Sequence, residues 1–480
     1  MHCRQLKVTM DDWMLSPTFS SSSPPSLQDS TLSSEDRNTL KELLGNPPTF
    51  MSTSSVPLGV GPQSFLAKRR LQGIGPDLLE RCFNQYPYLG LVLAECHFSL
   101  NDINGALEWC QKVKALLSSK DQGLQTAIDF LQQISSAELD SPDEDEEVTE
   151  GYTVQAYSRP GILGRVEDDQ VLSLSTETKH KLAELRASEK DAAAQFSRLA
   201  CVSSNEIEGI FSLTGNSISS LVKRGFLENA ITGISLSSRI KKKSTIVKIL
   251  ENAMKCISKV GHAKDIDEAL VLDLHETLLE DDFIMDSSEY GESFCYIIPR
   301  GQFRTSFCYA LRDIDMKEVR FCPARHIPGE MAWFYPRAEE VLSREDICPF
   351  HASAWLQWAF LRIHPFGDGN GRVSRMISSI PLMKVGLPPV IVTMESKQNY
   401  FKAIKTCDDT HDVGALAHFL CDELTASVSD LHTMTFGGSK RDLKAVNVAR
   451  LKHYIEKVPI VEKQPVFWGR DSDGKPTRFS

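Results

Sequence analysis

Residues 351 to 363 carry apolar side chains on nearly every side, and this stretch constrains the fold more than any other feature of the sequence. A helix that is apolar all round is stable only in the interior of a helical bundle. Pro365 then ends the helix, because a proline pushes the residue before it out of the helical conformation. We therefore expect an all-α bundle with this helix at its centre and with His364 at its exit.

A loop and a second helix follow at once. We expect this helix to begin near Gly371, because the next apolar residues recur with helical spacing, at Val373, Met376, Ile377 and Ile380. Its polar side carries Arg372 and Arg375, which lie three residues apart on one face and lean back toward the loop. Gly369, Asn370 and Gly371 bring free backbone N–H groups to the positive end of the helix, which makes an anion site.

Two further side chains would give this anion site its chemistry. Asp368 supplies a carboxylate able to hold Mg²⁺ against bound phosphates, and His364 supplies a base. Each feature has an ordinary alternative, since a histidine at a helix exit is often a cap and Gly-Asn-Gly is often only a turn. Together they favour a phosphate site, because all of them lie within twelve residues. The loop lacks the Gly-Lys-Ser/Thr ending of a Walker motif, which disfavours an ATPase of that class.

The charge and cysteine content exclude several other classes of protein. Eight acidic residues between 138 and 150 account for most of the formal net charge of −11, so the rest of the chain lacks the basic field that nucleic acids require. No two of the twelve cysteines are spaced as Cys-x-x-Cys, which argues against a zinc ribbon or a disulfide framework. No apolar run reaches the ~18 residues of a membrane helix, and no signal peptide is recognised. We expect a cytoplasmic or nuclear protein that binds neither membrane nor nucleic acid.

The length of 480 residues favours two folded units with flanking segments over a single core. Serine and proline crowd the N-terminal residues, which therefore cannot bury enough apolar surface to fold. The expected boundaries are a disordered segment 1–45, a helical region 46–137, an acidic linker 138–165, a second helical region 166–264, a catalytic core 265–425 and an extension of unknown role 426–480.

Within the first helical region, residues 93 to 108 resemble a tetratricopeptide repeat. Small Ala94 and Ala106 would let two antiparallel helices approach closely, and Asn101-Asp102 would form the turn between them. No second copy is found at the expected spacing of about 34 residues, so a single repeat-like hairpin is expected rather than an array. An ordinary helical hairpin and a partner-binding repeat both remain open.

The segment from His364 to Arg372, together with Arg375, closely resembles the signature of Fic proteins, which transfer AMP to protein hydroxyls. Upstream, Gly301-Gln-Phe-Arg304 resembles the family's Gly-x-Tyr/Phe-Arg element, which precedes a β-hairpin flap that aligns the target segment. The resemblance implies ATP contacts by the loop and by Tyr400, and a flap that includes Val319, Arg320, Phe321 and Cys322. It covers about residues 265 to 425 and implies a Fic-type helical bundle that uses ATP and Mg²⁺.

A further element, Ser204-x-x-x-Glu208-Gly209, resembles the inhibitory motif that precedes the core in one class of Fic proteins. The resemblance implies that Glu208 faces Arg375 and takes the donor that the γ-phosphate needs. A carboxylate in that position would also repel the incoming anion. The residues alone allow another interpretation, in which Ser203 and Glu206 form a capping box and Gly209 ends a helical turn. Beside an intact loop, the inhibitory interpretation is the better one.

The sequence also departs from the pattern of the family at two positions. Pro381 falls in the helix after the loop, where it should clash with the carbonyl of Ile377 and kink or end the helix. Asp408 stands where several relatives have an asparagine near the adenine, which puts that contact in doubt. Animal relatives with repeats carry a membrane anchor, and none is recognised in this sequence.

These observations predict a protein adenylyltransferase. Neutral His364 would take the proton from a Ser, Thr or Tyr hydroxyl of the target, which attacks the α-phosphorus of ATP. Mg²⁺ on Asp368, with Arg372 and the loop amides, would offset charge as pyrophosphate leaves. One alternative reverses the reaction, with Glu208 orienting a water that removes AMP from a modified protein. Another is an interaction scaffold with an idle site. The expected partner is a protein target; a chaperone is a candidate by analogy with relatives, and a homodimer is left open.

Overall fold

The computed structural model describes residues 87–100, 102–117, 124–125, 127–129, 131–132, 151–164, 172–188, 191–236, 238–280, 284–289, 292–305, 307–312, 315–437, 468–470 and 476–478. The expectations for residues 1–45, for the acidic stretch 138–150 and for most of 438–480 lie outside these ranges.

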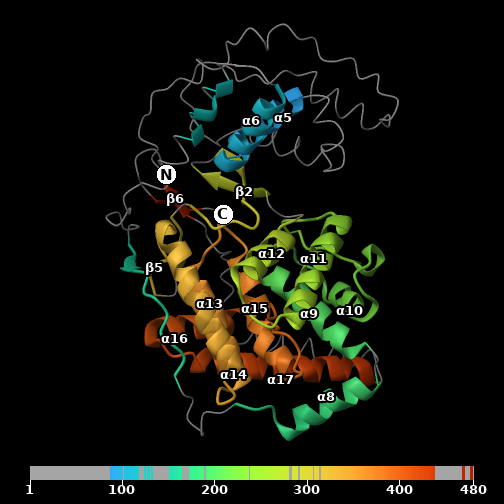
Figure 1. Cartoon of the computed structure of the whole chain (residues 1–480). Helices are drawn as coiled ribbons and strands as arrows, with labels where there is room; N and C mark the ends of the chain where they lie inside the picture. Colours follow the sequence, from blue (N-terminus) through green and yellow to red (C-terminus); the bar gives the residue numbers. More distant parts are fainter. Residues whose placement is uncertain are drawn as a thin grey trace.

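The described residues are mostly helical, as the sequence predicts (Figure 1). The α-helices are α5 (Pro87–Ser99), α6 (Ile103–Leu117), α8 (Thr176–Ser188), α9 (Ala192–Ile207), α10 (Gly215–Arg224), α11 (Lys243–His262), α12 (Glu268–Leu278), α13 (Ile327–Ser343), α14 (Pro349–Ile363), α15 (Asn370–Lys384), α16 (Lys397–Thr410) and α17 (Gly414–Phe436). Two 3-10 helices are η3 (Glu228–Ala230) and η4 (Ala324–His326). The strands are β1 (Thr153–Gln155), β2 (Ile284–Glu289), β3 (Glu292–Ile297), β4 (Tyr309–Arg312), β5 (Lys317–Arg320), β6 (Trp468–Arg470) and β7 (Pro476–Arg478).

Helices α14 and α15 lie at the centre of the bundle (Figure 1). Almost every residue of α14 is buried, and the helix contacts α13, α15 and α17. It ends at Ile363, two residues before Pro365, and α15 begins at Asn370. The predicted central helix, its exit at His364 and the start of the next helix are therefore confirmed.

Helix α9 brings the sequence before the core into contact with the centre of the bundle. It packs against α10 and α11, and its own contacts reach α15. Since α15 begins immediately after the loop, this arrangement sets the C-terminal end of α9 beside the predicted phosphate site. Helix α8 packs instead against α17, which crosses the base of the bundle in Figure 1.

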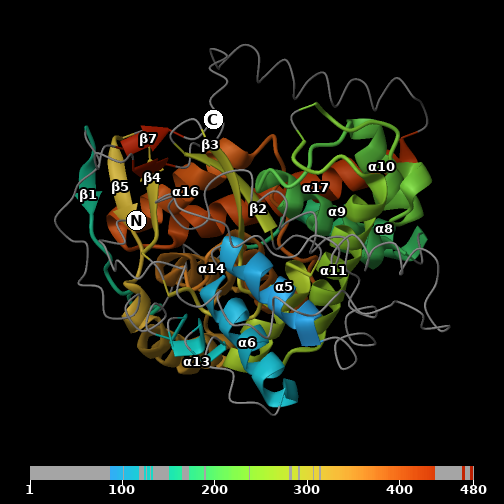
Figure 2. The same ribbon diagram turned by 90° about the horizontal axis from the view of Figure 1, so that it is seen from above.

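A small sheet stands beside the bundle, in the strand order β1-β5-β4 (Figure 2). The antiparallel hairpin of β4 and β5 is the flap expected from the sequence, and its pairing joins Tyr309 to Arg320 and Arg312 to Lys317. Strand β1 pairs in parallel with the other edge of β5, with Thr153 opposite Lys317 and Gln155 opposite Val319. The sequence did not predict this third strand.

Part of the expected linker belongs to the folded body instead. Besides the strand β1, the range 138–165 contains Leu163, whose side chain is buried in the main apolar cluster. The acidic run that defined the linker ends at Glu150, and the residues after it carry Tyr157, Ile162 and Leu163 among polar neighbours. Composition averaged over the whole stretch hid these few apolar positions.

Helices α5 and α6 form an antiparallel hairpin above the bundle, next to β2 in Figure 1. Ala94 and Ala106 are both buried in a separate apolar cluster, as expected for close helix contact. Asp102 directly precedes α6, and its side chain accepts a hydrogen bond of 2.9 Å from the N–H of Gly105. The hairpin meets the rest of the chain through a 2.9 Å bond from the N–H of Ile297 to the carbonyl of Leu100. Whether it binds a partner stays a prediction.

The end of the core differs from the expected bounds in two ways. Helix α15 continues through Pro381 to Lys384, so the proline does not end the helix at that position. Helix α17 runs past residue 425 to Phe436, so the folded body extends into the expected C-terminal extension. No helix in the part of the chain that the structure describes has the length and apolar character needed to cross a bilayer.

Candidate active site

His364 leaves α14 in a left-handed conformation, with φ 53° and ψ 59°. Such a backbone costs a non-glycine residue about 1 to 3 kcal/mol and persists only where the surroundings hold it. Here the His364 N–H bonds the carbonyl of Phe360 at 2.9 Å, and the imidazole stacks on Phe321 of the flap, with ring centroids 3.8 Å apart. Nδ1 lies 3.2 Å from the carbonyl of Leu361, which can only accept, so Nδ1 carries the proton and Nε2 keeps a lone pair.

Arg304 fixes the position of His364 from the other side. Its Nε donates to the carbonyl of His364 at 2.8 Å, its Nη2 donates to the carbonyl of Cys322, and its backbone N–H donates to Pro365. The Gly-x-Phe-Arg element thus ties the loop to the flap. Burial, together with the positive charge of Arg304, lowers the pKa of His364 to about 3. The imidazole is therefore neutral at physiological pH, as a proton acceptor must be.

Asn370 closes the loop on itself. Its side-chain oxygen accepts from the N–H of Phe366 at 3.0 Å, and its side-chain nitrogen donates to the carbonyl of Phe366 at 2.8 Å. Both ends of the amide are thereby used inside the loop, so Asn370 shapes the site rather than offering its side chain to a ligand. Gly369 adopts φ 77° just before α15, a conformation that glycine takes without strain.

Asp368 and Arg372 lie next to each other at the start of α15. Nη2 of Arg372 is 3.6 Å from a carboxylate oxygen of Asp368, whose side chain is 31% exposed. Burial alone would raise the pKa of Asp368, but the charges of Arg372 and Arg239 outweigh it and hold the pKa below its ordinary value. An ionised, partly exposed carboxylate beside helix N–H groups suits Mg²⁺, which takes one or two protein carboxylates and completes its shell with phosphates and water.

Arg375, Ser204 and Glu208 meet where α9 touches α15. Nε of Arg375 donates to the hydroxyl of Ser204 at 2.9 Å, and Nη2 donates to the carbonyl of Ser204 at 3.0 Å and to Glu208 Oε1 at 2.6 Å. The carboxylate also fills the space over Gly371, since a Cβ on that glycine would lie 2.1 Å from Glu208 Oε1. Glu208 thus stands at the amide end of α15, against an arginine that is 2% exposed.

The end of α9 explains how Glu208 reaches this position. The helix stops at Ile207, and Gly209 turns the chain away with φ 71°. Lys397 donates to the carbonyl of Ile207 at 2.7 Å and so supports this last turn, a contact that the sequence did not reveal. The capping-box interpretation of Ser203 and Glu206 is wrong, because these residues lie at the C-terminal end of α9 rather than at its start.

Tyr400 lies close to this ion pair but is 1% exposed. Its hydroxyl accepts from Gln357 at 2.9 Å and interacts with Arg375, so it supports the arginine from behind. A direct contact between Tyr400 and a nucleotide therefore stays a prediction. The neighbouring Phe401 is 51% exposed, and the amine of Lys397 lies 5.8 Å from the centre of its ring.

The four predicted flap residues occupy different environments. Phe321 covers His364, and the carbonyl of Cys322 accepts from Arg304. Val319 is buried, and Arg320 pairs with Glu318 at 2.8 Å within β5. Of the four, Phe321 contacts the predicted catalytic loop through its side chain, by the stacking of its ring on His364.

His275, on α12, is a supporting residue that the sequence alone did not reveal. It is fully buried, its Nδ1 accepts from the N–H of Gly301 at 2.9 Å, and its Nε2 lies 3.1 Å from the carbonyl of Asp368 and so donates to it. Its ring stacks on Phe366, with centroids 3.7 Å apart. His275 therefore holds the backbone of the metal-binding candidate in place. A histidine on the apolar face of a helix is the one signal that sequence offers, and it fits an ordinary core residue equally well.

These two buried histidines predict how stability depends on pH. Burial lowers the pKa of His275 to about 4, and that of His364 lies at about 3. Unfolded histidine titrates near 6.5, so between pH 6.5 and 4 the unfolded chain binds more protons than the folded one. The free energy of unfolding should therefore fall as the pH falls through this window, by up to about 1.4 kcal/mol per pH unit for each histidine.

The check is urea unfolding between pH 7 and pH 4.5, with His275→Phe as the comparison. The variant keeps an aromatic ring against Phe366 but cannot titrate, so its stability should depend less steeply on pH. Other groups that titrate in this range are common to both proteins and cancel. Equal slopes would mean that His275 is not held neutral by the fold.

The segment that carries this geometry matches a known family. Residues 265–382 match the Fic/DOC family. This segment is a Fic domain. Its sequence is 33% identical over 108 residues to "Protein adenylyltransferase Fic" of Drosophila erecta and 32% identical over 108 residues to the protein of the same name in Drosophila persimilis. Each alignment covers 22% of this chain and 21% of the relative, so the chain spans about a fifth of the length of the relatives it matches.

Solved structures of Fic proteins are also similar to this chain. A Fic domain containing signaling protein from Bacteroides thetaiotaomicron shares 19% identity and a TM-score of 0.41, covering 55% of this chain and 97% of that one. Fic-1 (aa134–508) from C. elegans shares 15% identity and a TM-score of 0.39, covering 78% of this chain and 98% of that one. The Fic domain identified by sequence contains His275, Arg304, the flap and the whole loop from His364 to Arg375.

Proposed function

We propose that this protein transfers AMP from ATP to a hydroxyl side chain of a target protein. The observation that carries the proposal is the loop after α14, inside the segment that matches the Fic/DOC family. Within twelve residues this loop and the start of α15 hold a neutral His364, an ionised Asp368 and the buried Arg372 and Arg375. The curated relatives bear the name of this activity. The test is to incubate the protein with Mg²⁺ and ATP labelled at the α-phosphate, and to look for labelled AMP bound to protein and for released pyrophosphate.

His364 would accept the proton of the attacking hydroxyl at Nε2. The bond from Nδ1 to Leu361 and the stacking on Phe321 orient the ring for this step. The oxygen of the target then forms a bond to the α-phosphorus while the bond to the β-phosphate oxygen breaks, and pyrophosphate leaves. Arg372 and the N–H groups at the start of α15 would hold the phosphates during this exchange.

Asp368 is the residue that would hold Mg²⁺. Bound there, the ion would neutralise phosphate charge and so favour departure of pyrophosphate. The protein supports this role by keeping the carboxylate ionised beside Arg372 and by fixing its backbone through His275.

We further propose that the resting enzyme is restrained by Glu208. Arg375 is the donor that a γ-phosphate would need, and the 2.6 Å contact with Glu208 uses it. A phosphate approaching Gly371 would also meet the carboxylate at close range. ATP can still bind beside such a pair, but not with all of its phosphates in the position that transfer requires.

A further inference from the structure

The flap strand β5 offers a site for an extended protein segment, and one end of that site lies at the proposed base. The residue that follows β5 is Phe321, whose ring covers His364. A protein target must bring a hydroxyl to Nε2 of His364, so some part of its backbone has to pass close to this strand. Extended segments bind most readily by adding a strand to the edge of an existing sheet.

One edge of β5 pairs with β4, and strand β1 already occupies the other edge. We infer that residues 153–155 are an exchangeable cover, and that an extended segment of the protein substrate takes their place on β5 when it presents its hydroxyl to His364. The inference rests on the proposed transfer of AMP to a protein, and it adds a second restraint that acts on the protein substrate rather than on ATP.

The positions of the strands favour this edge of β5 over the outer edge of β4 as the docking site. Strands in a sheet lie about 4.8 Å apart, so a segment in the place of β1 would be one spacing from β5. In the part of the chain that the structure describes, β4 pairs with β5 alone, so its outer side is a second candidate. A segment added there would be two spacings, or about 10 Å, from β5 and from the residue that covers His364.

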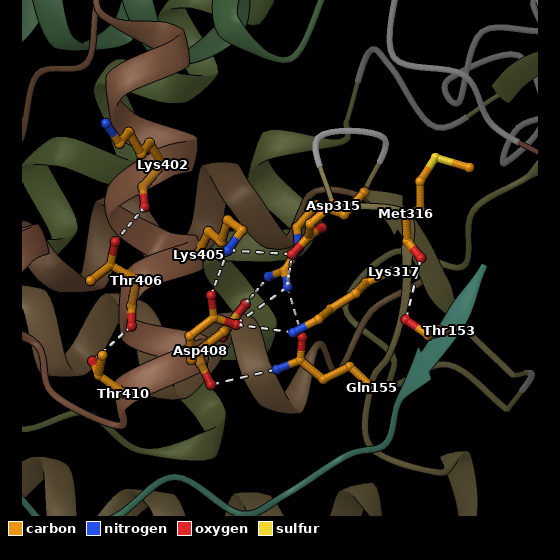
Figure 3. Close-up of polar contacts among 12 residues, drawn as sticks. Thr153, Gln155, Asp315, Met316, Lys317, Lys402, Lys405, Thr406, Asp408 and Thr410 are labelled. Carbon is orange, nitrogen blue, oxygen red and sulfur yellow. Dashed lines mark hydrogen bonds and ion pairs between the residues drawn. The ribbon is translucent and has the colours of Figure 1, made fainter.

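Strand β1 is a short strand at the edge of the sheet. It pairs over only three residues, and Thr153 and Val154 are exposed. The N–H of Thr153 donates to the carbonyl of Met316 at 2.9 Å, and Gln155 accepts from Arg312 at 2.9 Å and reaches the carbonyl of Asp408 at 3.5 Å. Figure 3 shows Thr153 at the carbonyl of Met316 and Gln155 between the flap and Asp408 of α16.

The residues that follow β1 are held far more firmly. Arg159 pairs with Glu330 of α13 at 2.6 Å, and Tyr157 donates to the same carboxylate at 2.8 Å. The indole N–H of Trp355 donates to the carbonyl of Gly161 at 2.8 Å. The segment is therefore anchored at its C-terminal end, and β1 can separate from β5 while that anchor stays in place. Exchange with another strand requires such a separation.

The test uses proline to break the pairing of β1 at chosen positions, in the full chain that also carries Glu208→Gly. In a parallel ladder, alternate residues bond the neighbour strand, so Thr153 and Gln155 donate to β5 and Val154 faces away. The double variant Thr153→Pro/Gln155→Pro removes both donors, whereas Val154→Pro is the matched control that removes neither. Gln155→Ala is a milder second variant, in case the prolines impair folding.

Two reactions are measured for each variant, with ATP labelled at the α-phosphate. One is attachment of AMP to proteins of a cell extract. The other is transfer of AMP to water, which yields AMP and pyrophosphate and needs no docked protein. The double variant should raise attachment to proteins about five- to tenfold, and Gln155→Ala less, while release of AMP into water stays unchanged. The control should match the parent in both reactions.

The inference is overturned if the double variant and Gln155→Ala label proteins no better than Val154→Pro while all of them release AMP into water. It is also overturned if detaching β1 lowers protein labelling, because β1 would then be part of the docking surface. If the Glu208→Gly parent neither labels proteins nor releases AMP, the proposed function itself fails, and this inference fails with it.

Discussion

Replacing His364 by alanine should lower the rate of AMP transfer by about 100- to 10,000-fold, the usual contribution of a positioned general base. The neutral imidazole keeps its lone pair at Nε2, because Nδ1 is tied to Leu361, and no other described histidine stands in the loop after α14. Binding of Mg-ATP should change little, since the phosphates would be held by Arg372 and the N–H groups of α15. The measurement is labelling by ATP that carries the label at its α-phosphate, with nucleotide binding followed separately by calorimetry.

A matched control is His262→Ala, which removes an exposed histidine at the end of α11, away from the loop. This variant should transfer AMP as fast as the parent protein. If His364→Ala retained full labelling while remaining folded, the base would have to be another group. If it lost nucleotide binding as well, His364 would be a structural part of the loop rather than the base.

Glu208→Gly should raise the rate of AMP transfer by about 10- to 100-fold, which is a typical size for coupling between an inhibitory contact and a site. The substitution frees Arg375 and opens the space over Gly371, so that all three phosphates can be held in one arrangement. It also leaves a buried guanidinium without its carboxylate, so the melting temperature should fall, and saturating Mg-ATP should restore part of the loss.

Glu206→Gln is the control for this substitution. Glu206 lies two residues before Glu208 and accepts a 2.8 Å bond from the N–H of Leu213, which a glutamine oxygen can still accept. Its replacement should leave the rate of AMP transfer unchanged. Hydrolysis of the bond between AMP and a modified target would give the decisive opposite result. If the parent protein releases AMP from a modified target and Glu208→Gly loses this activity, the enzyme is a hydrolase and Glu208 orients its water.

The parts of the site that are adjacent in the sequence could be predicted from it. A helix that is apolar on all sides, a proline after His364 and helical spacing beyond Gly371 are local signals, and each acts within a few residues. These signals are sufficient to predict the central helix pair and the exit of His364. They also predict the start of α15 within one residue of its position at Asn370.

The contacts made by distant segments could not be predicted in this way. His275 reaches the loop from α12, Lys397 reaches the end of α9, and β1 reaches the flap across more than 150 residues. A lone histidine, a lone lysine and three residues of strand carry no local signal that distinguishes them from ordinary surface or core residues. The interpretation of Ser203 and Glu206 as a capping box failed for a related reason, since the same spacing occurs at either end of a helix.

The single contact between Glu208 and Arg375 has a consequence for how this protein can change by mutation. Most substitutions harm an enzyme because many atoms must be placed correctly for catalysis. Under the proposed restraint the relation is inverted at position 208, because most residues other than an acid would remove the contact with Arg375. One random change would then yield an overactive enzyme, so a cell that carries this gene risks gain of activity as easily as loss of it. Such an arrangement favours a second, independent restraint on the same reaction.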